Sequence, residues 1–142
     1  MQSDALVEWT FTELPASVSA EEPFSVQLTA RIADGWHVYS ISQPPGGPMA
    51  TSISMPPGQA FRLAGPIAGP KPESVWDETF EMDTEYYAGA ATFMIPLQVD
   101  ANDASGSKDL VVEISFQGCS ESTCRPPAKV RVSAPVKVSK PI

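Results

Sequence analysis

Two cysteines, Cys119 and Cys124, are the residues whose type and spacing could support redox chemistry. They are the only cysteines among 142 residues, and four residues separate them. Two thiols this close can form a reversible disulfide, which carries two electrons without a cofactor. The alternative is a structural disulfide, common in small secreted domains. A closed loop of about six residues contributes only roughly 2 kcal/mol of chain entropy, against about 4–5 kcal/mol for a long loop. The pair would be a weak structural clip, so we favour exchange.

The residues around the pair set expectations for its reactivity. Gly118 precedes it and Pro126-Pro127 follows it, which would present the sulfur atoms on a rigid backbone. Glu121 should disfavour a thiolate and Arg125 should favour one. The spacing is not the Cys-x-x-Cys of thioredoxin-like proteins, and no predicted helix N-terminus lies nearby to activate a thiol. We therefore expect thiols that react mainly with a docked partner.

Alternating apolar and polar residues predict the strands that must position the pair. Phe24 to Ile32 alternates almost without exception, and Asp34-Gly35 then predicts a hairpin into residues 36–41. Residues 91–99 also alternate, and Pro96 predicts an edge strand or a bulge there. The last two strands, near residues 110–116 and 130–138, would hold both cysteines at the tip of their hairpin. About eight or nine short strands predict an all-β, immunoglobulin-like antiparallel β-sandwich in one domain over residues 1–142.

Composition excludes several classes of function. Nine basic against 17 acidic residues give a net charge of −8, so no nucleic-acid partner is expected. A single histidine, His37, excludes multi-histidine metal sites, and no partner motif for a catalytic triad accompanies it. A copper(I) site from the two cysteines with Met82 or His37 is disfavoured because no Met-x-x-Met cluster is present. We expect neither a metal nor a cofactor.

The compartment stays open on these grounds. No apolar run approaches the length of a membrane helix, about 18 residues. The N-terminal residues lack the basic and apolar regions of a signal peptide, which taken literally indicates the cytoplasm. Met1 could also follow a removed signal, and two close cysteines are compatible with an oxidising compartment.

Several short motifs carry a family resemblance from about residue 5 to 138. They are Phe116-Gln117-Gly118-Cys119, Cys124 with Pro126-Pro127, Val75-Trp76 with the acidic aromatic stretch after it, Gly35-Trp36-His37-Val38-Tyr39-Ser40, and Gly46-Gly47-Pro48 with Thr51-Ser52. In this order the chain resembles the N-terminal periplasmic domain family of the bacterial thiol:disulfide interchange protein DsbD. The resemblance implies an immunoglobulin-like fold that passes electrons from a thioredoxin-like domain to periplasmic disulfide proteins, with a membrane-spanning segment of the full-length chain left open.

The resemblance also implies roles for single residues. Cys124 would form the mixed disulfide with partners and Cys119 would resolve it. A short cap loop would shield the pair through an aromatic side chain, for which Phe80 is the best match, although the spacing from Trp76 to Phe80 and that between the cysteines are each one residue shorter than in the family. Taken alone, Phe80 fits a core or edge aromatic better than a cap, and the resemblance brings the two roles level. Tyr39 would pack beside the cysteines or serve as an ordinary sheet tyrosine. The rival function is a secreted β-sandwich for binding or adhesion, with a structural disulfide.

Overall fold

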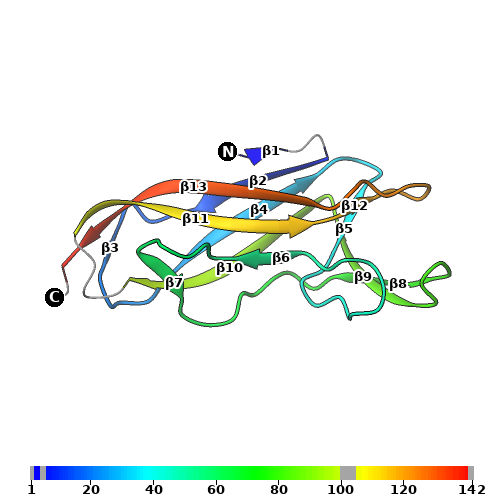
Figure 1. Ribbon diagram of the computed structural model, residues 1–142, viewed down its shortest axis with the longest axis horizontal. Coiled ribbons are helices and arrows are strands. Elements are labelled where there is room, and N and C mark those ends of the chain that lie inside the picture. Colours follow the sequence, from blue (N-terminus) through cyan, green and yellow to red (C-terminus); the bar gives the residue numbers. More distant parts are fainter. Residues whose placement is uncertain (1, 4–5, 100–104, 141–142) are drawn as a thin grey trace.

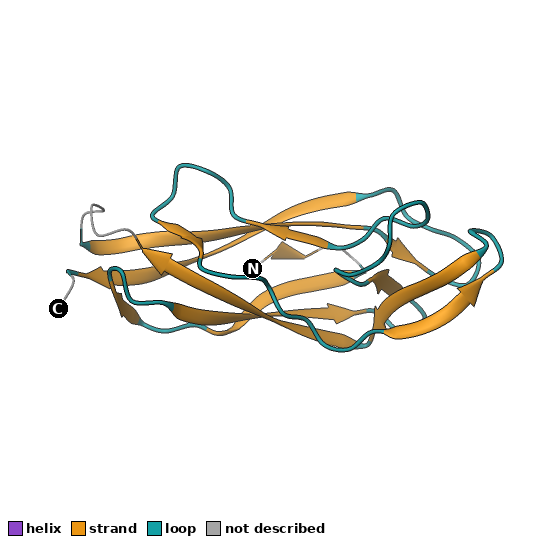
Figure 2. Ribbon diagram, turned by 90° about the horizontal axis from the view of Figure 1, so that it is seen from below, coloured by secondary structure: helices purple, strands orange, loops and turns teal. Residues whose placement is uncertain are grey.

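The protein is all-β in the computed structural model, which describes residues 2–3, 6–99 and 105–140. The strands form two large sheets along the long axis of the molecule, with a smaller third sheet at one end (Figures 1 and 2). This arrangement confirms the predicted immunoglobulin-like β-sandwich. The described part of the chain contains no helix, and so none that is long and apolar enough to cross a membrane.

The first sheet has the strand order β1-β2-β4-β10-β7 and the second has the order β3-β13-β11-β6. All neighbours in them pair antiparallel except β13 and β3, which pair parallel. Strands of the first sheet are β1 (Gln2–Ser3), β2 (Val7–Glu13), β4 (Phe24–Ile32), β10 (Ala90–Val99) and β7 (Phe61–Leu63). Strands of the second sheet are β3 (Ser17–Ser19), β13 (Ala128–Ser139), β11 (Gly106–Phe116) and β6 (Ser52–Ser54).

The third sheet has the order β12-β5-β9-β8, and every pair in it is antiparallel. Its strands are β12 (Gly118–Cys119), β5 (His37–Tyr39), β9 (Met82–Ala88) and β8 (Glu73–Asp77). In Figure 1 it lies at the right-hand end, opposite the end where β3 lies. The described residues form 13 strands in all, more than the eight or nine predicted, because strands of two or three residues are too short to show alternation.

A core of aromatic side chains joins the three sheets. The ring of Trp9 in β2 lies 6.1 Å from that of Phe93 in β10 and 5.4 Å from that of Phe116 in β11. Tyr87 in β9 packs edge-on against Phe93 with 5.5 Å between ring centroids. Trp9, Phe93 and Phe116 are at most 1% exposed. Because Phe116 ends the long strand β11, the cysteine segment begins directly above this core.

The predicted hairpin after Asp34-Gly35 is wrong. Strand β5 pairs with β12 and β9 in the third sheet, and it does not pair with β4. Both edges of β4 are already occupied by β2 and β10, so no position beside it is free. The turn, in which Gly35 has φ +82° and the Trp36 N–H donates to the Ala33 carbonyl at 3.1 Å, therefore leads the chain into the third sheet.

The prediction for Pro96 is also wrong, since β10 lies between β4 and β7 and pairs with β4 without a bulge. The Pro96 carbonyl accepts a hydrogen bond from the Ala64 N–H at 2.9 Å. In an antiparallel strand the nitrogen and the oxygen of one residue point to the same neighbour. The Pro96 nitrogen, which carries no hydrogen, therefore faces the side where β7 has just ended at Leu63. The hydrogen bonds between β10 and β4 are all kept.

Candidate functional site

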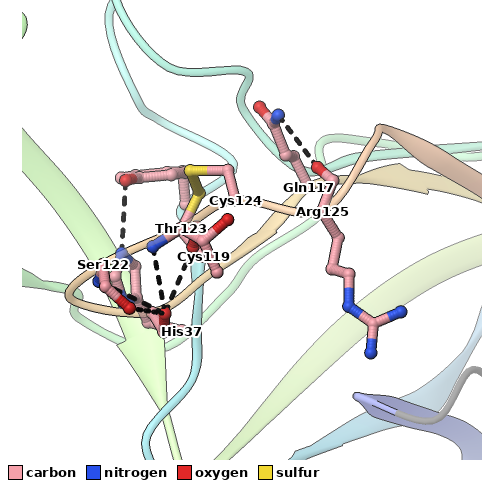
Figure 3. The surroundings of a disulfide bond; sticks show 9 residues. His37, Gln117, Cys119, Ser122, Thr123, Cys124 and Arg125 are labelled. Atoms are coloured by element: carbon pink, nitrogen blue, oxygen red, sulfur yellow. Dashed lines mark hydrogen bonds between the residues drawn. A yellow bond between two sulfur atoms is a disulfide. The ribbon is translucent and has the colours of Figure 1, made fainter.

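The two cysteines form a disulfide at the tip of the β11–β13 hairpin, as predicted (Figure 3). Their Cα atoms are 4.0 Å apart, and the two residues also form an isolated antiparallel bridge. Cys119 ends the short strand β12, which pairs with β5 of the third sheet. The tip is therefore attached to that sheet by main-chain pairing.

Main-chain hydrogen bonds close the same loop that the disulfide closes. The Ser120 N–H donates to the Thr123 carbonyl at 2.7 Å, and the Arg125 N–H donates to the Gly118 carbonyl at 2.8 Å. The Ser120 hydroxyl oxygen accepts from the N–H groups of Ser122 and Thr123 at 3.3 and 3.2 Å. Since these bonds do not depend on the sulfur atoms, the disulfide adds little constraint to the folded loop.

The two sulfur-bearing residues differ strongly in exposure. Cys119 is 2% exposed, whereas Cys124 and its sequence neighbours on both sides are exposed. A thiolate from another protein can therefore approach Cys124 and is excluded from Cys119. This asymmetry matches the division of roles that the resemblance implies.

Gly118 allows β12 to approach Leu6, the residue before β2, closely. A Cβ atom on residue 118 would lie 2.8 Å from Leu6 Cδ1, which is closer than real Cβ contacts. Gly118, Cys119 and Leu6 are all buried, so a side chain at residue 118 would require either the Leu6 side chain or strand β12 to shift. Gly118 is therefore needed at this position because a larger residue would overlap Leu6.

Arg125 is held away from the sulfur atoms, against the expectation that it favours a Cys124 thiolate. Its guanidinium carbon lies 5.8 Å from the centroid of the Trp36 ring, and Figure 3 shows the side chain pointing away from the disulfide. The Arg125 carbonyl accepts a hydrogen bond from Gln117 Nε2 at 3.1 Å. Arg125 therefore anchors the chain after Cys124. Its guanidinium forms a cation–π contact with Trp36 and does not contact the disulfide.

His37 lies beside the pair, although the sequence interpretation considered it only as a disfavoured copper(I) ligand with the two cysteines. It is the cross-strand partner of Cys119 in the β5–β12 ladder. Its Nε2 lies within hydrogen-bond distance of the Tyr39 hydroxyl, at 3.2 Å, and its ring packs against those of Tyr39 and Tyr86. Its position in the motif around Gly35-Trp36 was visible in the sequence, but the register that brings it to Cys119 joins segments about 80 residues apart.

The aromatic groups of β5 have shifted pKa values. Burial lowers the pKa of His37, and the negative charge of Asp77 partly opposes this. Burial raises the pKa of Tyr39, and Asp77 raises it further. Tyr39 is 4% exposed and lies on the strand next to β12, so it is part of the same cluster. At neutral pH the cluster beside Cys119 thus holds a neutral imidazole and a neutral phenol.

Phe80 lies in the turn between β8 and β9, at the same end of the molecule as the disulfide tip (Figure 1). The Asp77 carboxylate accepts hydrogen bonds from the N–H groups of Thr79 and Phe80 at 2.9 and 3.1 Å, which shapes the turn. Phe80 is 39% exposed and Trp76 is 57% exposed. Phe80 forms no aromatic ring contact with the described residues, and its cap role stays a prediction.

The glycine-rich loop before β6 packs at the base of this turn. A side chain at Gly47 would overlap the sulfur atom of Met82, which begins β9. The Gly46-Gly47-Pro48 motif therefore has a packing role next to the β8–β9 hairpin. Among the described residues, no group of three or more His, Cys, Asp or Glu side chains could hold a metal ion.

Comparison with known proteins points to one family. The family described as thiol:disulfide interchange protein DsbD, N-terminal, matches residues 5–135. No curated protein is similar enough in sequence to count as a relative.

Two solved structures share the fold. The DsbD N-terminal domain of Neisseria meningitidis in the reduced form has 22% sequence identity and a TM-score of 0.55, covering 83% of this chain and 82% of that one. The N-terminal periplasmic domain of ScsB from Proteus mirabilis has 18% identity and a TM-score of 0.53, covering 95% of this chain and 47% of that one. At these identities the likeness concerns the fold alone.

Proposed function

This chain belongs to the family of N-terminal domains of the thiol:disulfide interchange protein DsbD, and we propose that it relays electrons between redox proteins through a reversible Cys119–Cys124 disulfide. The observation that carries the proposal is the unequal exposure of the two cysteines in a loop that main-chain hydrogen bonds already close. A bond that contributes little to folding and exposes one of its two residues suits exchange better than stapling.

The exchange proceeds in two balanced steps. A thiolate of a reduced partner attacks the sulfur atom of Cys124, forms a mixed disulfide, and releases Cys119 as the leaving thiolate, which takes up a proton. A second thiol of the partner then attacks the partner's own sulfur in the mixed disulfide and releases Cys124. The partner leaves oxidised and this domain leaves with two thiols. Running the steps in reverse passes the two electrons to the next disulfide.

A partner of thioredoxin-like type fits the end of the molecule that carries the disulfide. Trp76 and Phe80 of the β8–β9 hairpin expose large apolar side chains at this end, and aromatic side chains are enriched in protein interfaces. Because Cys124 is exposed in this structure, the turn holding Phe80 does not cover the pair here. We propose that this turn closes over Cys124 between encounters and stands open when a partner docks, with Tyr39 fixing the strand behind it. The periplasm, where disulfides persist, is the compartment that suits this function.

The reduction potential of the pair tests the relay against the structural clip. Structural disulfides typically have potentials below about −300 mV, so a relay requires a value clearly above that. Equilibration of the protein with a glutathione or dithiothreitol redox buffer measures it. A value below about −300 mV would favour the rival, a secreted β-sandwich for binding or adhesion.

A trapping experiment tests the assignment of the two cysteines. The Cys119→Ala variant should accumulate a mixed disulfide with an oxidised thioredoxin-like protein, because no resolving thiol remains. Cys124→Ala is the matched control and should trap little, since Cys119 is buried. Equal trapping by both variants, or by neither, would contradict the proposed roles.

A further inference from the structure

His37 and Cys119 are neighbours across the edge of the third sheet. They are directly paired in the β5–β12 ladder, and antiparallel partners place their side chains on the same face with Cβ atoms about 4.5–5.5 Å apart. His37 is the single histidine of the chain. Figure 3 places it among the residues that surround the disulfide.

The imidazole ring is held in position from two sides. The Tyr39 ring packs edge-on against it with 5.2 Å between centroids, and the Tyr86 ring lies tilted at the same distance. His37 Nε2 faces the Tyr39 hydroxyl at 3.2 Å. In the tautomer in which Nε2–H donates to that hydroxyl, the lone pair of Nδ1 is available to accept a proton.

The titratable groups facing His37 come from every strand of the third sheet. They are Tyr39 on β5, Tyr86 on β9, Asp77 on β8 and Cys119 on β12, with Glu73 on β8 across the ladder from Tyr86. Burial lowers the pKa of His37, so the ring is neutral near pH 7 and can act as a base. The negative charge of Asp77 favours the imidazolium that would form when the ring takes a proton.

We propose that His37 is the general base that takes the proton of the Cys119 thiol when Cys119 resolves a mixed disulfide at Cys124. The inference rests on the proposed exchange function and adds a catalytic group to it. The Cys119 proton moves to Nδ1 as the Cys119 sulfur attacks Cys124. The bond between Cys124 and the partner sulfur breaks, and the partner leaves as a thiolate. In the reverse direction the imidazolium returns the proton to the Cys119 thiolate.

The buried position of Cys119 makes such a base useful. At 2% exposure the residue has little access to water, and a thiolate without a nearby positive charge is costly at a buried site. Arg125, the cation nearest in sequence, lies over Trp36 and points away from the disulfide. Among the described neighbours, His37 is the group whose chemistry fits proton transfer near pH 7.

Resolution of a small-molecule mixed disulfide tests the proposal without any protein partner. The reduced protein is mixed with dithiobis-nitrobenzoate, so that Cys124 forms a mixed disulfide and Cys119 then displaces the second coloured thiolate. The first-order rate of this second phase should be flat between about pH 6.5 and 8 in the natural protein, where His37 is neutral and thiols are protonated. In His37→Gln it should be about 100-fold slower at pH 7, since a general base contributes at least about that factor. The rate of His37→Gln should also rise about tenfold per pH unit and meet the natural rate near pH 9, where thiols ionise without a base.

Tyr86→Phe is the matched control, because it keeps a ring against His37 and should reproduce the natural profile. Equal rates for the natural protein and His37→Gln at every pH, an equal slowing at every pH, or a Tyr86→Phe profile like that of His37→Gln would overturn the proposal. If His37→Gln does not fold, a rate that rises tenfold per unit through the same pH range in the natural protein overturns it equally. Failure to exchange with a thioredoxin-like protein would instead count against the relay, and it would not affect the proposal that His37 is the base for Cys119.

Discussion

Reducing the Cys119–Cys124 bond should lower the free energy of unfolding by only about 2 kcal/mol. The bond joins residues five apart in sequence, so it closes a loop of about six residues in the unfolded chain. The chain-entropy relation then gives about 7 cal/mol/K, or about 2 kcal/mol at 25 °C. In the folded state the bonds from Ser120 to Thr123 and from Arg125 to Gly118 keep the loop closed after reduction.

Urea unfolding of the oxidised protein and of the Cys119→Ser, Cys124→Ser double variant measures this difference, with the midpoint of thermal unfolding expected to fall by about 4–8 °C. A thermodynamic cycle gives a second measurement of the same quantity. The folded protein must have a reduction potential more negative than that of the unfolded chain by about 40 mV, since 30 mV corresponds to about 1.4 kcal/mol.

A loss above about 4 kcal/mol would refute the reasoning. That magnitude is expected when a disulfide closes a loop of about 100 residues, not a hairpin tip. It would mean that the bond stabilises structure well beyond residues 119–124, as a structural clip does. A change of potential that disagreed with the stability difference would show that reduction rearranges the folded tip.

Three further outcomes follow from contacts around the tip. Gly118→Ala should cost about 1–3 kcal/mol in urea unfolding, because its Cβ would press on Leu6 Cδ1; an unchanged stability would mean that Leu6 moves aside freely. Trp36→Leu should lower the free energy of unfolding by about 0.5–1 kcal/mol, because the contact with Arg125 is lost. It should also speed amide hydrogen exchange at residues 120–124. Unchanged exchange there would refute the anchoring role of Arg125. Because burial lowers the pKa of His37, the unfolded chain binds a proton first as the pH falls through about 6.5, and the free energy of unfolding should decrease there. In His37→Gln the free energy of unfolding should change less with pH in this range. A slope equal to that of the natural protein would contradict this assignment to His37.

The sequence predicted best the strands that have one face buried in the core and the other face towards solvent. Strand β4 runs over Phe24–Ile32, the predicted bounds, because apolar residues on its inner face alternate with polar residues on its outer face. The hairpin expected after Asp34-Gly35 failed because turn residues indicate that a chain reverses, but they do not say which strand it will meet. Pro96 failed for a similar reason, since the missing donor matters only on the side where a partner lies.

The candidate site divides in the same way. Sequence alone identified Cys119 and Cys124 and placed them at a hairpin tip, because two thiols at short spacing have few chemical uses and strong strands flank them. It did not identify His37 as the partner of Cys119, nor the position of Arg125 over Trp36. Which cysteine is buried, which group faces it and where the nearest charge points depend on pairing between β5, β9 and β12. This pairing depends on packing between segments that are far apart in the chain. Local sequence patterns therefore do not predict it, and only the tertiary structure decides it.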